Sequence, residues 1–180
     1  MVGSFFIGKD MITKSISVID IEECGFKATW TMLSLAVPYF ICRSEIIEYA
    51  IDVCTQGIVS FPEVDYLAGL SADDIDEINE TLEKLSKREE INIETERSKL
   101  KAVILFKDLT TCPAATDSIN DEFIIKENLI DLWLYLYEPK DGDLYFGKYD
   151  EHGILREDYT ILYCSVKKWV IDEIERLLSV

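Results

Sequence analysis

The sequence predicts a mainly α-helical fold of about six helices, with a small β-hairpin near residues 144–157, in one compact domain over residues 1–180. Two observations carry the helical part of this prediction. Apolar residues recur at intervals of three and four along most of the chain, which is the period of an amphipathic helix. Proline, glycine and hydroxyl side chains interrupt this pattern where helices are expected to begin and end.

Three helices are predicted in the first part of the chain. Residues 28–37 (ATWTMLSLAV) are expected to form a helix that Pro38 ends, because proline cannot continue a helix. In residues 44–54 (SEIIEYAIDVC) the apolar side chains fall at helical spacing, and Ser44 is expected to cap this helix. The third helix, over residues 62–69, begins with a proline and ends with a glycine, as helices often do.

The clearest helical pattern covers residues 71–89 (SADDIDEINETLEKLSKRE), with Ser71 at its start. Its apolar residues are spaced by three, four and three positions: Ile75, Ile78, Leu82 and Leu85. Acidic residues come first and basic residues last, which complements the helix dipole. The apolar pattern and the charges agree, so the sequence predicts an amphipathic helix with an acidic outer face.

The second half of the chain gives a mixed pattern. Residues 94–109 fit either a helix or a buried strand, and their length favours the helix. Residues 120–137 and 160–178 are predicted to be helices, the second of them amphipathic. Between these two, the runs 144–149 (LYFGKY) and 153–158 (GILRED), joined by the turn DEHG, are typical of a hairpin.

The net charge of −17, from 35 acidic and 18 basic residues, is the most unusual property of the sequence. Most of it comes from two blocks, residues 63–99 with a net charge of −7 and residues 117–159 with a net charge of −8. A chain with this charge repels nucleic acids and anionic membranes, so neither is expected as a direct partner. A basic protein is the partner that such a charge favours.

No catalytic, metal or cofactor motif is found in the sequence, so neither an enzyme nor a cofactor is predicted. The single histidine, His152, lies in the turn DEHG and is expected to be solvated, with a role as a general base as the alternative. The five cysteines form no C-x-x-C pair and are expected to be reduced and mostly buried. No apolar run is long enough for a signal peptide or a membrane span, so a cytoplasmic location is expected.

Two groups of residues are candidates for binding a basic partner. The first lies on the helix predicted over residues 71–89: Asp73, Asp76, Glu77, Glu80 and Glu83. The second lies around the predicted hairpin: Asp141, Asp143, Tyr145, Tyr149, Asp150 and Glu151. Aromatic and acidic side chains together suit an arginine- and lysine-rich surface. A solvated helix face explains the first group equally well, and burial in the core is favoured for the aromatic residues.

Two stretches, residues 28–54 and 62–85, together resemble a bacterial family known as domain of unknown function 2247. The shared pattern includes Trp30 and Leu33, the segment EIIEYAI and the turn LAGLS before an acidic helix, and it covers roughly residues 28–90. The resemblance supplies no active-site residues. Small acidic proteins of this kind are similar to immunity proteins of contact-dependent inhibition and polymorphic toxin systems, which bind a cognate toxin domain, often a basic nuclease.

The resemblance and the charge together imply an immunity protein that covers the active site of a basic toxin domain. Two alternatives stay open at this point. One is an enzyme with a cysteine or carboxylate site, with Mg²⁺ at Asp141, Asp143, Asp150 or Glu151. The other is an acidic mimic of nucleic acid that occupies a DNA-binding protein.

Overall fold

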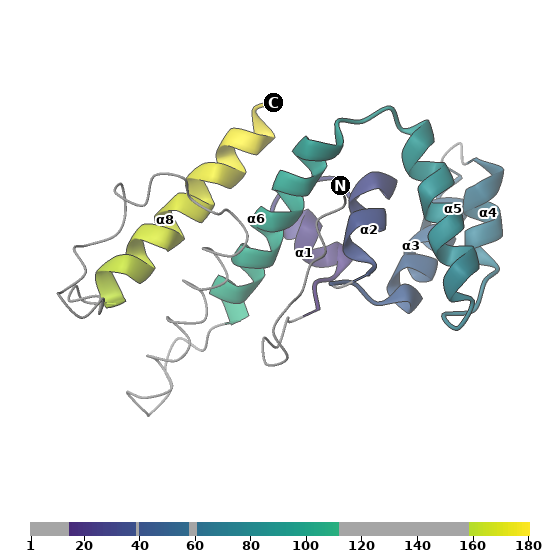
Figure 1. The fold of residues 1–180 in the computed structure, drawn as a ribbon, viewed down its shortest axis with the longest axis horizontal. Coiled ribbons are helices and arrows are strands. Elements are labelled where there is room, and N and C mark those ends of the chain that lie inside the picture. The colour runs from purple at the N-terminus through teal and green to yellow at the C-terminus, as the bar shows by residue number, and fades with distance from the viewer. Residues whose placement is uncertain (1–14, 39, 58–60, 112–158) are drawn as a thin grey trace, which may run out of the picture.

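The computed structural model describes residues 15–38, 40–57, 61–111 and 159–180, and these residues form seven helices (Figure 1). The helices are α1 (Val18–Glu23), α2 (Trp30–Ala36), α3 (Arg43–Thr55), α4 (Pro62–Ala68), α5 (Ile75–Arg88), α6 (Ile93–Thr111) and α8 (Tyr159–Leu178). The helices predicted over residues 28–37, 62–69 and 160–178 correspond to α2, α4 and α8.

The predicted fold class, helices with a β-hairpin, is wrong, because the described residues are helical and contain no strand. A two-stranded hairpin alone is marginally stable in water, and the described part of the chain offers no further strand with which one could pair. Residues 144–157 themselves, and the helix predicted over residues 120–137, lie outside the described residues. The assignment of residues 1–180 to one domain stays a prediction.

Helix α6 occupies a central position among the described helices (Figure 1). Helices α1 and α2 pack on one side of it and α8 packs on the other. Helix α2 also packs against α5, which contacts α4, and α4 contacts α3. Helices α3, α4 and α5 therefore form one end of the molecule, and α8 lies at the opposite end.

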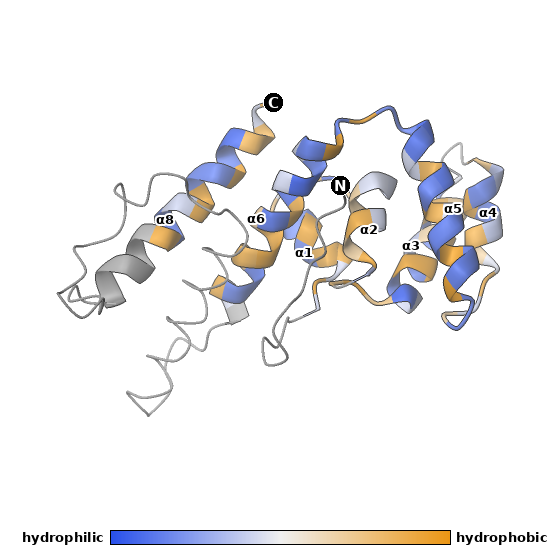
Figure 2. Cartoon of the chain, in the orientation of Figure 1, coloured by the Kyte–Doolittle hydropathy of each residue, from blue (hydrophilic) through white to orange (hydrophobic). Residues whose placement is uncertain are grey.

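One hydrophobic core joins all seven helices. Figure 2 shows apolar positions alternating with hydrophilic ones along α5 and α8, as expected of helices with one buried face. Helix α6 differs, because its run from Leu100 to Leu105 is buried almost throughout, between α1 and α2 on one side and α8 on the other. Burial on several sides explains why this run lacks a clear helical period and also fitted a strand.

Two helices begin at residues other than those predicted. Helix α3 begins at Arg43 with Cys42 as its N-cap, so Ser44 lies inside the helix and does not cap it. Helix α5 begins at Ile75, four positions after Ser71. In the turn before α5, the backbone N–H of Ser71 donates to a carboxylate oxygen of Asp74 at 2.8 Å, and this local hydrogen bond replaces the first turn of helix.

Replacing Glu90 with glycine is expected to stabilise the fold by about 0.5–1 kcal/mol. Glu90 follows α5 and has a φ of 50°, a left-handed conformation that costs a side chain free energy and costs glycine none. Urea unfolding of Glu90→Gly and Glu90→Ala measures the effect, since alanine keeps the steric cost. A glycine variant that is no more stable than the alanine variant would contradict this assignment.

Candidate functional site

The first predicted group of acidic residues lies on one exposed surface of α5 and the turn before it. Asp76, Glu77, Glu80 and Glu83 are on the helix and Asp73 precedes it, and all five are exposed. The opposite face of α5 buries Ile78, Thr81, Leu82 and Leu85 in the core. The helix therefore presents its carboxylates to solvent, where they are open to a partner.

Ion pairs within α5 divide this surface into two halves. Glu80 pairs with Lys84 and Glu83 pairs with Lys87, each at 2.7 Å. The hydrogen bond from Lys87 lowers the pKa of Glu83, and the hydrogen bond to Glu80 raises the pKa of Lys84. Asp76 and Glu77, at the start of α5, form no such ion pair with a described residue. The negative charge that α5 leaves unpaired therefore lies in its first turn.

The acidic surface extends from α5 over α3 and α4. Residues 44–83 contain eleven acidic residues and no lysine, arginine or histidine. By contrast, residues 91–111, which include α6, have three acids and four bases, and residues 159–180 have three of each. With the four bases at their ends included, residues 43–88 have a net charge of −7, so the charge of the described residues is concentrated in α3, α4, α5 and the turn before α5, which we call the acidic end.

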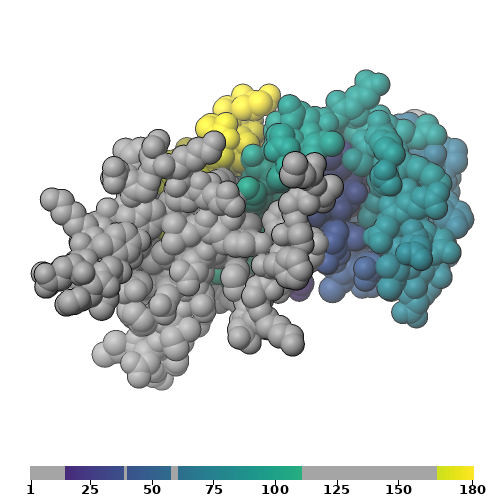
Figure 3. Space-filling view, viewed as in Figure 1, coloured from purple at the N-terminus to yellow at the C-terminus, as the bar shows by residue number. Residues whose placement is uncertain are grey.

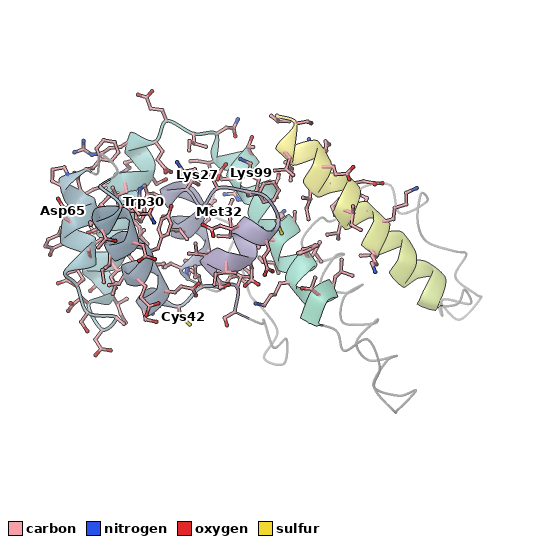
Figure 4. The ribbon with its side chains drawn as sticks, turned by 180° about the vertical axis from the view of Figure 1, so that it is seen from behind. Lys27, Trp30, Met32, Cys42, Asp65 and Lys99 are labelled. Carbon is pink, nitrogen blue, oxygen red and sulfur yellow. The ribbon has the colours of Figure 1, made fainter. Side chains whose placement is uncertain are left out.

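The figures show where the acidic end lies in the molecule. Asp65 on α4 lies at the tip of this end, whereas Lys99 on α6 lies near α8 (Figure 4). In the space-filling view, α5 contributes a broad part of the surface at this end (Figure 3). A partner could therefore contact α5 without approaching α8.

Contacts between α4 and α5 set the direction in which the two helices run. Arg88, at the end of α5, forms an ion pair of 2.6 Å with Glu63 at the start of α4, and its guanidinium lies 5.1 Å from the ring centre of Phe61. The two helices are therefore antiparallel. Tyr66, which follows on α4 and is 56% exposed, lies near Lys84 in the second half of α5.

Three buried or half-buried carboxylates are engaged in structural hydrogen bonds. Glu89 accepts from the backbone at the start of α2, and Glu96 accepts from the Thr29 hydroxyl at 2.6 Å and from Lys99 at 2.8 Å. Asp20 accepts from Lys107. Within the described residues, no three histidine, cysteine or carboxylate side chains are grouped so that they could hold a metal ion.

Cys24, Cys42 and Cys54 are free thiols with different environments. Cys24 is buried, Cys54 is half-buried and Cys42 is exposed, so the prediction of mostly buried thiols is wrong for Cys42. Burial, with the nearby charges of Asp20 and Glu23, raises the pKa of the Cys24 thiol to about 12. A thiol with this pKa is protonated at neutral pH and is a poor nucleophile.

The second predicted group lies outside the described residues. Its members are Asp141, Asp143, Tyr145, Tyr149, Asp150 and Glu151, and His152 lies there too. Among the described residues, the candidate surface therefore consists of the acidic end alone. Sequence reasoning missed Tyr66 on this surface, and it missed the absence of bases over residues 44–83, a signal that the sequence carries.

None of the described helices is both long and apolar enough to cross a bilayer. The fold and the surface thus define an all-helical arrangement, over the described residues, with one strongly acidic end.

Residues 19–125, more than half of the chain, match the family described as an uncharacterized protein conserved in bacteria (DUF2247), and the chain belongs to that family. The match includes α2 to α6 and all of α1 except its first residue. No curated protein and no solved structure matches the chain significantly.

Proposed function

We propose that this protein is an immunity protein, which binds a basic toxin domain through its acidic end and blocks the active site of the toxin. The observation that carries the proposal is that residues 44–83 contain eleven acidic residues and no basic one, nine of them on α3, α4 and α5 and two in the turn before α5, at one end of the fold. We infer that the toxin is a nuclease, because a nuclease needs a basic groove to bind its substrate.

The acidic end would favour binding in two ways, by raising the rate of association and by competing with nucleic acid. A concentrated negative field attracts a cationic protein over several ångströms and raises the rate of association. The same carboxylates compete with nucleic acid phosphates for the lysine and arginine side chains of the toxin. This role requires binding alone, so we propose that the protein is not an enzyme and acts in the bacterial cytoplasm, with no direct contact to nucleic acid or membrane.

Co-expression tests the proposal. The toxin candidate is the C-terminal domain of a large secreted protein encoded next to this gene, produced in a bacterial host with and without this protein. We expect the toxin domain alone to stop growth, and co-expression to restore growth and yield a complex that purifies intact. Failure to restore growth, or a neighbouring gene that encodes no such protein, would overturn the proposal.

Neutralising Asp76 and Glu77 is expected to slow association with the toxin domain about five-fold at low salt. These two carboxylates are exposed and form no ion pair with a described residue, so they contribute fully to the attractive field. Stopped-flow measurement of Asp76→Asn/Glu77→Gln at about 0.05 and 0.5 M NaCl checks this, since salt screens the field and should remove the difference.

The matched control is the double variant Asp172→Asn/Glu175→Gln on α8, which removes the same charge from two exposed positions at the opposite end. We expect its association rate to differ from that of the wild type by less than about two-fold. Equal slowing by both double variants would show that the toxin responds to total charge and not to the acidic end.

A further inference from the structure

We propose that two copies of this chain associate through the exposed side of α8, antiparallel about Ile171, so that Lys167 of each copy lies beside Glu175 of the other. The contact lies at the end of the fold opposite the acidic end, so it goes beyond the proposed function. Two observations on the described residues carry it. One is a stripe of exposed side chains on α8, and the other is the distribution of charge between the two ends.

Four exposed residues of α8 form a stripe along one side of the helix, next to its buried face. They follow one another at intervals of four, four and three positions, which places them on the same side: Lys167, Ile171, Glu175 and Leu178. The apolar members are large and well exposed, Ile171 by 41% and Leu178 by 51%. Because these two are seven positions apart, both can contact a second helix along one seam.

The charges of this stripe are arranged symmetrically about Ile171. Lys167 lies four positions before it and Glu175 lies four positions after it. When two such helices run antiparallel with their Ile171 side chains in contact, a two-fold axis places each lysine beside the glutamate of the other copy. A parallel arrangement would bring like charges together, so the antiparallel one is favoured. The printed ion pair nearby joins Arg176 to Glu173, and no described residue pairs with Lys167 or Glu175.

The distribution of charge favours a second copy at α8 over a second copy elsewhere. Residues 43–88 have a net charge of −7, so contact between two acidic ends brings like charges together. Residues 159–180 contain three acids and three bases, so two copies meet little net repulsion there. Helix α8 lies at the edge of the described helices, with α6 on its inner side (Figure 1). A contact through α8 therefore leaves both acidic ends free.

The association should be weak, because the contact is small. The stripe covers residues 167–178, which is about 17 Å of helix, and a single pair of helices of this length buries less than a standard interface does. We expect a dissociation constant on the order of 100 µM. At the concentrations of about 1 µM that suit stopped-flow measurement the protein is then monomeric, so the Asp172→Asn/Glu175→Gln variant does not act through this contact.

Sedimentation equilibrium of the full-length protein, over concentrations of about 5–500 µM, tests the inference, and we expect a reversible equilibrium of monomer and dimer. Reversing one charge, by Lys167→Glu or by Glu175→Lys, places like charges side by side at both symmetric contacts. Each variant should therefore weaken the dimer about ten-fold. An equimolar mixture of the two variants should associate about as strongly as the wild type, because both contacts in the mixed dimer are attractive again.

The two reversals also separate a specific contact from general repulsion. Lys167→Glu makes the net charge of −17 more negative by two, whereas Glu175→Lys makes it less negative by two. Repulsion alone would weaken the dimer in the first variant and strengthen it in the second, whereas the inferred contact weakens it in both. Lys87→Glu, an exposed change on α5, is the matched control, because it alters the net charge as Lys167→Glu does. Its dimer should stay within about two-fold of the wild type.

A protein that stays monomeric at every concentration would overturn the inference. So would opposite effects of the two reversals, a mixture of the two variants that stays monomeric, or a loss in Lys87→Glu equal to that in Lys167→Glu. None of these measurements involves a toxin domain, so failure of the inference and failure of the immunity role can be told apart.

Discussion

Replacing Glu89 with alanine is expected to lower the free energy of unfolding by about 3 kcal/mol. Glu89 follows the last residue of α5, and its carboxylate accepts three hydrogen bonds at the start of α2. They come from the backbone N–H groups of Trp30 and Thr31, at 2.9 and 2.8 Å, and from the Thr31 hydroxyl at 2.9 Å. The variant leaves these donors, on the buried residues Trp30 and Thr31, without that acceptor.

The effect should be large because Glu89 acts on two helices at once. The hydroxyl of Thr29 satisfies only one further N–H of α2, that of Met32. Without the carboxylate, α2 loses most of its N-terminal cap and α5 loses its polar link to α2. Urea unfolding of Glu89→Ala measures the loss.

Glu83→Ala is the control, because it removes a carboxylate of α5 whose ion pair with Lys87 is exposed. We expect it to change the free energy of unfolding by less than about 0.5 kcal/mol. Comparable losses in the two variants would mean that the contact between Glu89 and α2 contributes little to stability.

The acidic residues thus fall into two groups that a count of charge cannot separate. Asp20, Glu89 and Glu96 lie between helices and accept hydrogen bonds, so they contribute to the fold. Asp76 and Glu77 lie on the surface and contribute to the field that a partner meets. A net charge of −17 therefore overstates the charge that recognition can use, and the location of the exposed acids is the more informative property.

The helices with one apolar face could be predicted from the sequence. Helices α5 and α8 bury residues at intervals of three and four, and this period is a local property of the sequence. Helix α1 was missed, although Ser17 and Asp20 form a capping box that the sequence contains. With six residues, α1 is too short for a periodic pattern.

The polar contacts that fix helix ends were beyond sequence reasoning. The backbone N–H of Val18, at the start of α1, donates to Glu45 on α3 at 2.6 Å, from 27 positions away in the chain. Glu89 is 59 positions from Trp30. Such pairs depend on how the helices pack, which no local pattern specifies. The same reason explains why Ser44 and Ser71, good capping residues by type, do not cap α3 and α5.

The candidate site was predictable in part. The helical period places the acidic residues of α5 opposite its buried face, and the structure places them there. The exposure of Tyr66 could not be inferred from the spacing of α4, because an aromatic residue at such a position is as often buried as exposed. Only the packing of α4 against α3 and α5 shows which of its sides remains free.

Replacing Asp20 with asparagine is expected to destabilise the protein by about 2–3 kcal/mol at neutral pH, and by much less in acid. Asp20 is buried, and its carboxylate accepts from Lys107 at 2.6 and 2.7 Å and from the backbone N–H of Ser17 at 2.6 Å. Burial by itself would raise the pKa of Asp20, but the hydrogen bonds from Lys107 and Ser17 outweigh it and hold the pKa below the ordinary value of 3.8.

The direction of this pKa shift determines the pH dependence. Because the pKa of Asp20 is lower in the folded than in the unfolded state, ionised Asp20 stabilises the fold above about pH 4, and this contribution is lost as the pH falls through the folded pKa. Urea unfolding of wild type and Asp20→Asn at about pH 7 and pH 3 should therefore show a difference that shrinks in acid. Glu22→Gln, an exposed change on the same helix, should differ little from wild type at either pH. A difference for Asp20→Asn that stays constant between the two pH values would mean that shape and hydrogen bonding at this position matter, and that the charge paired with Lys107 does not.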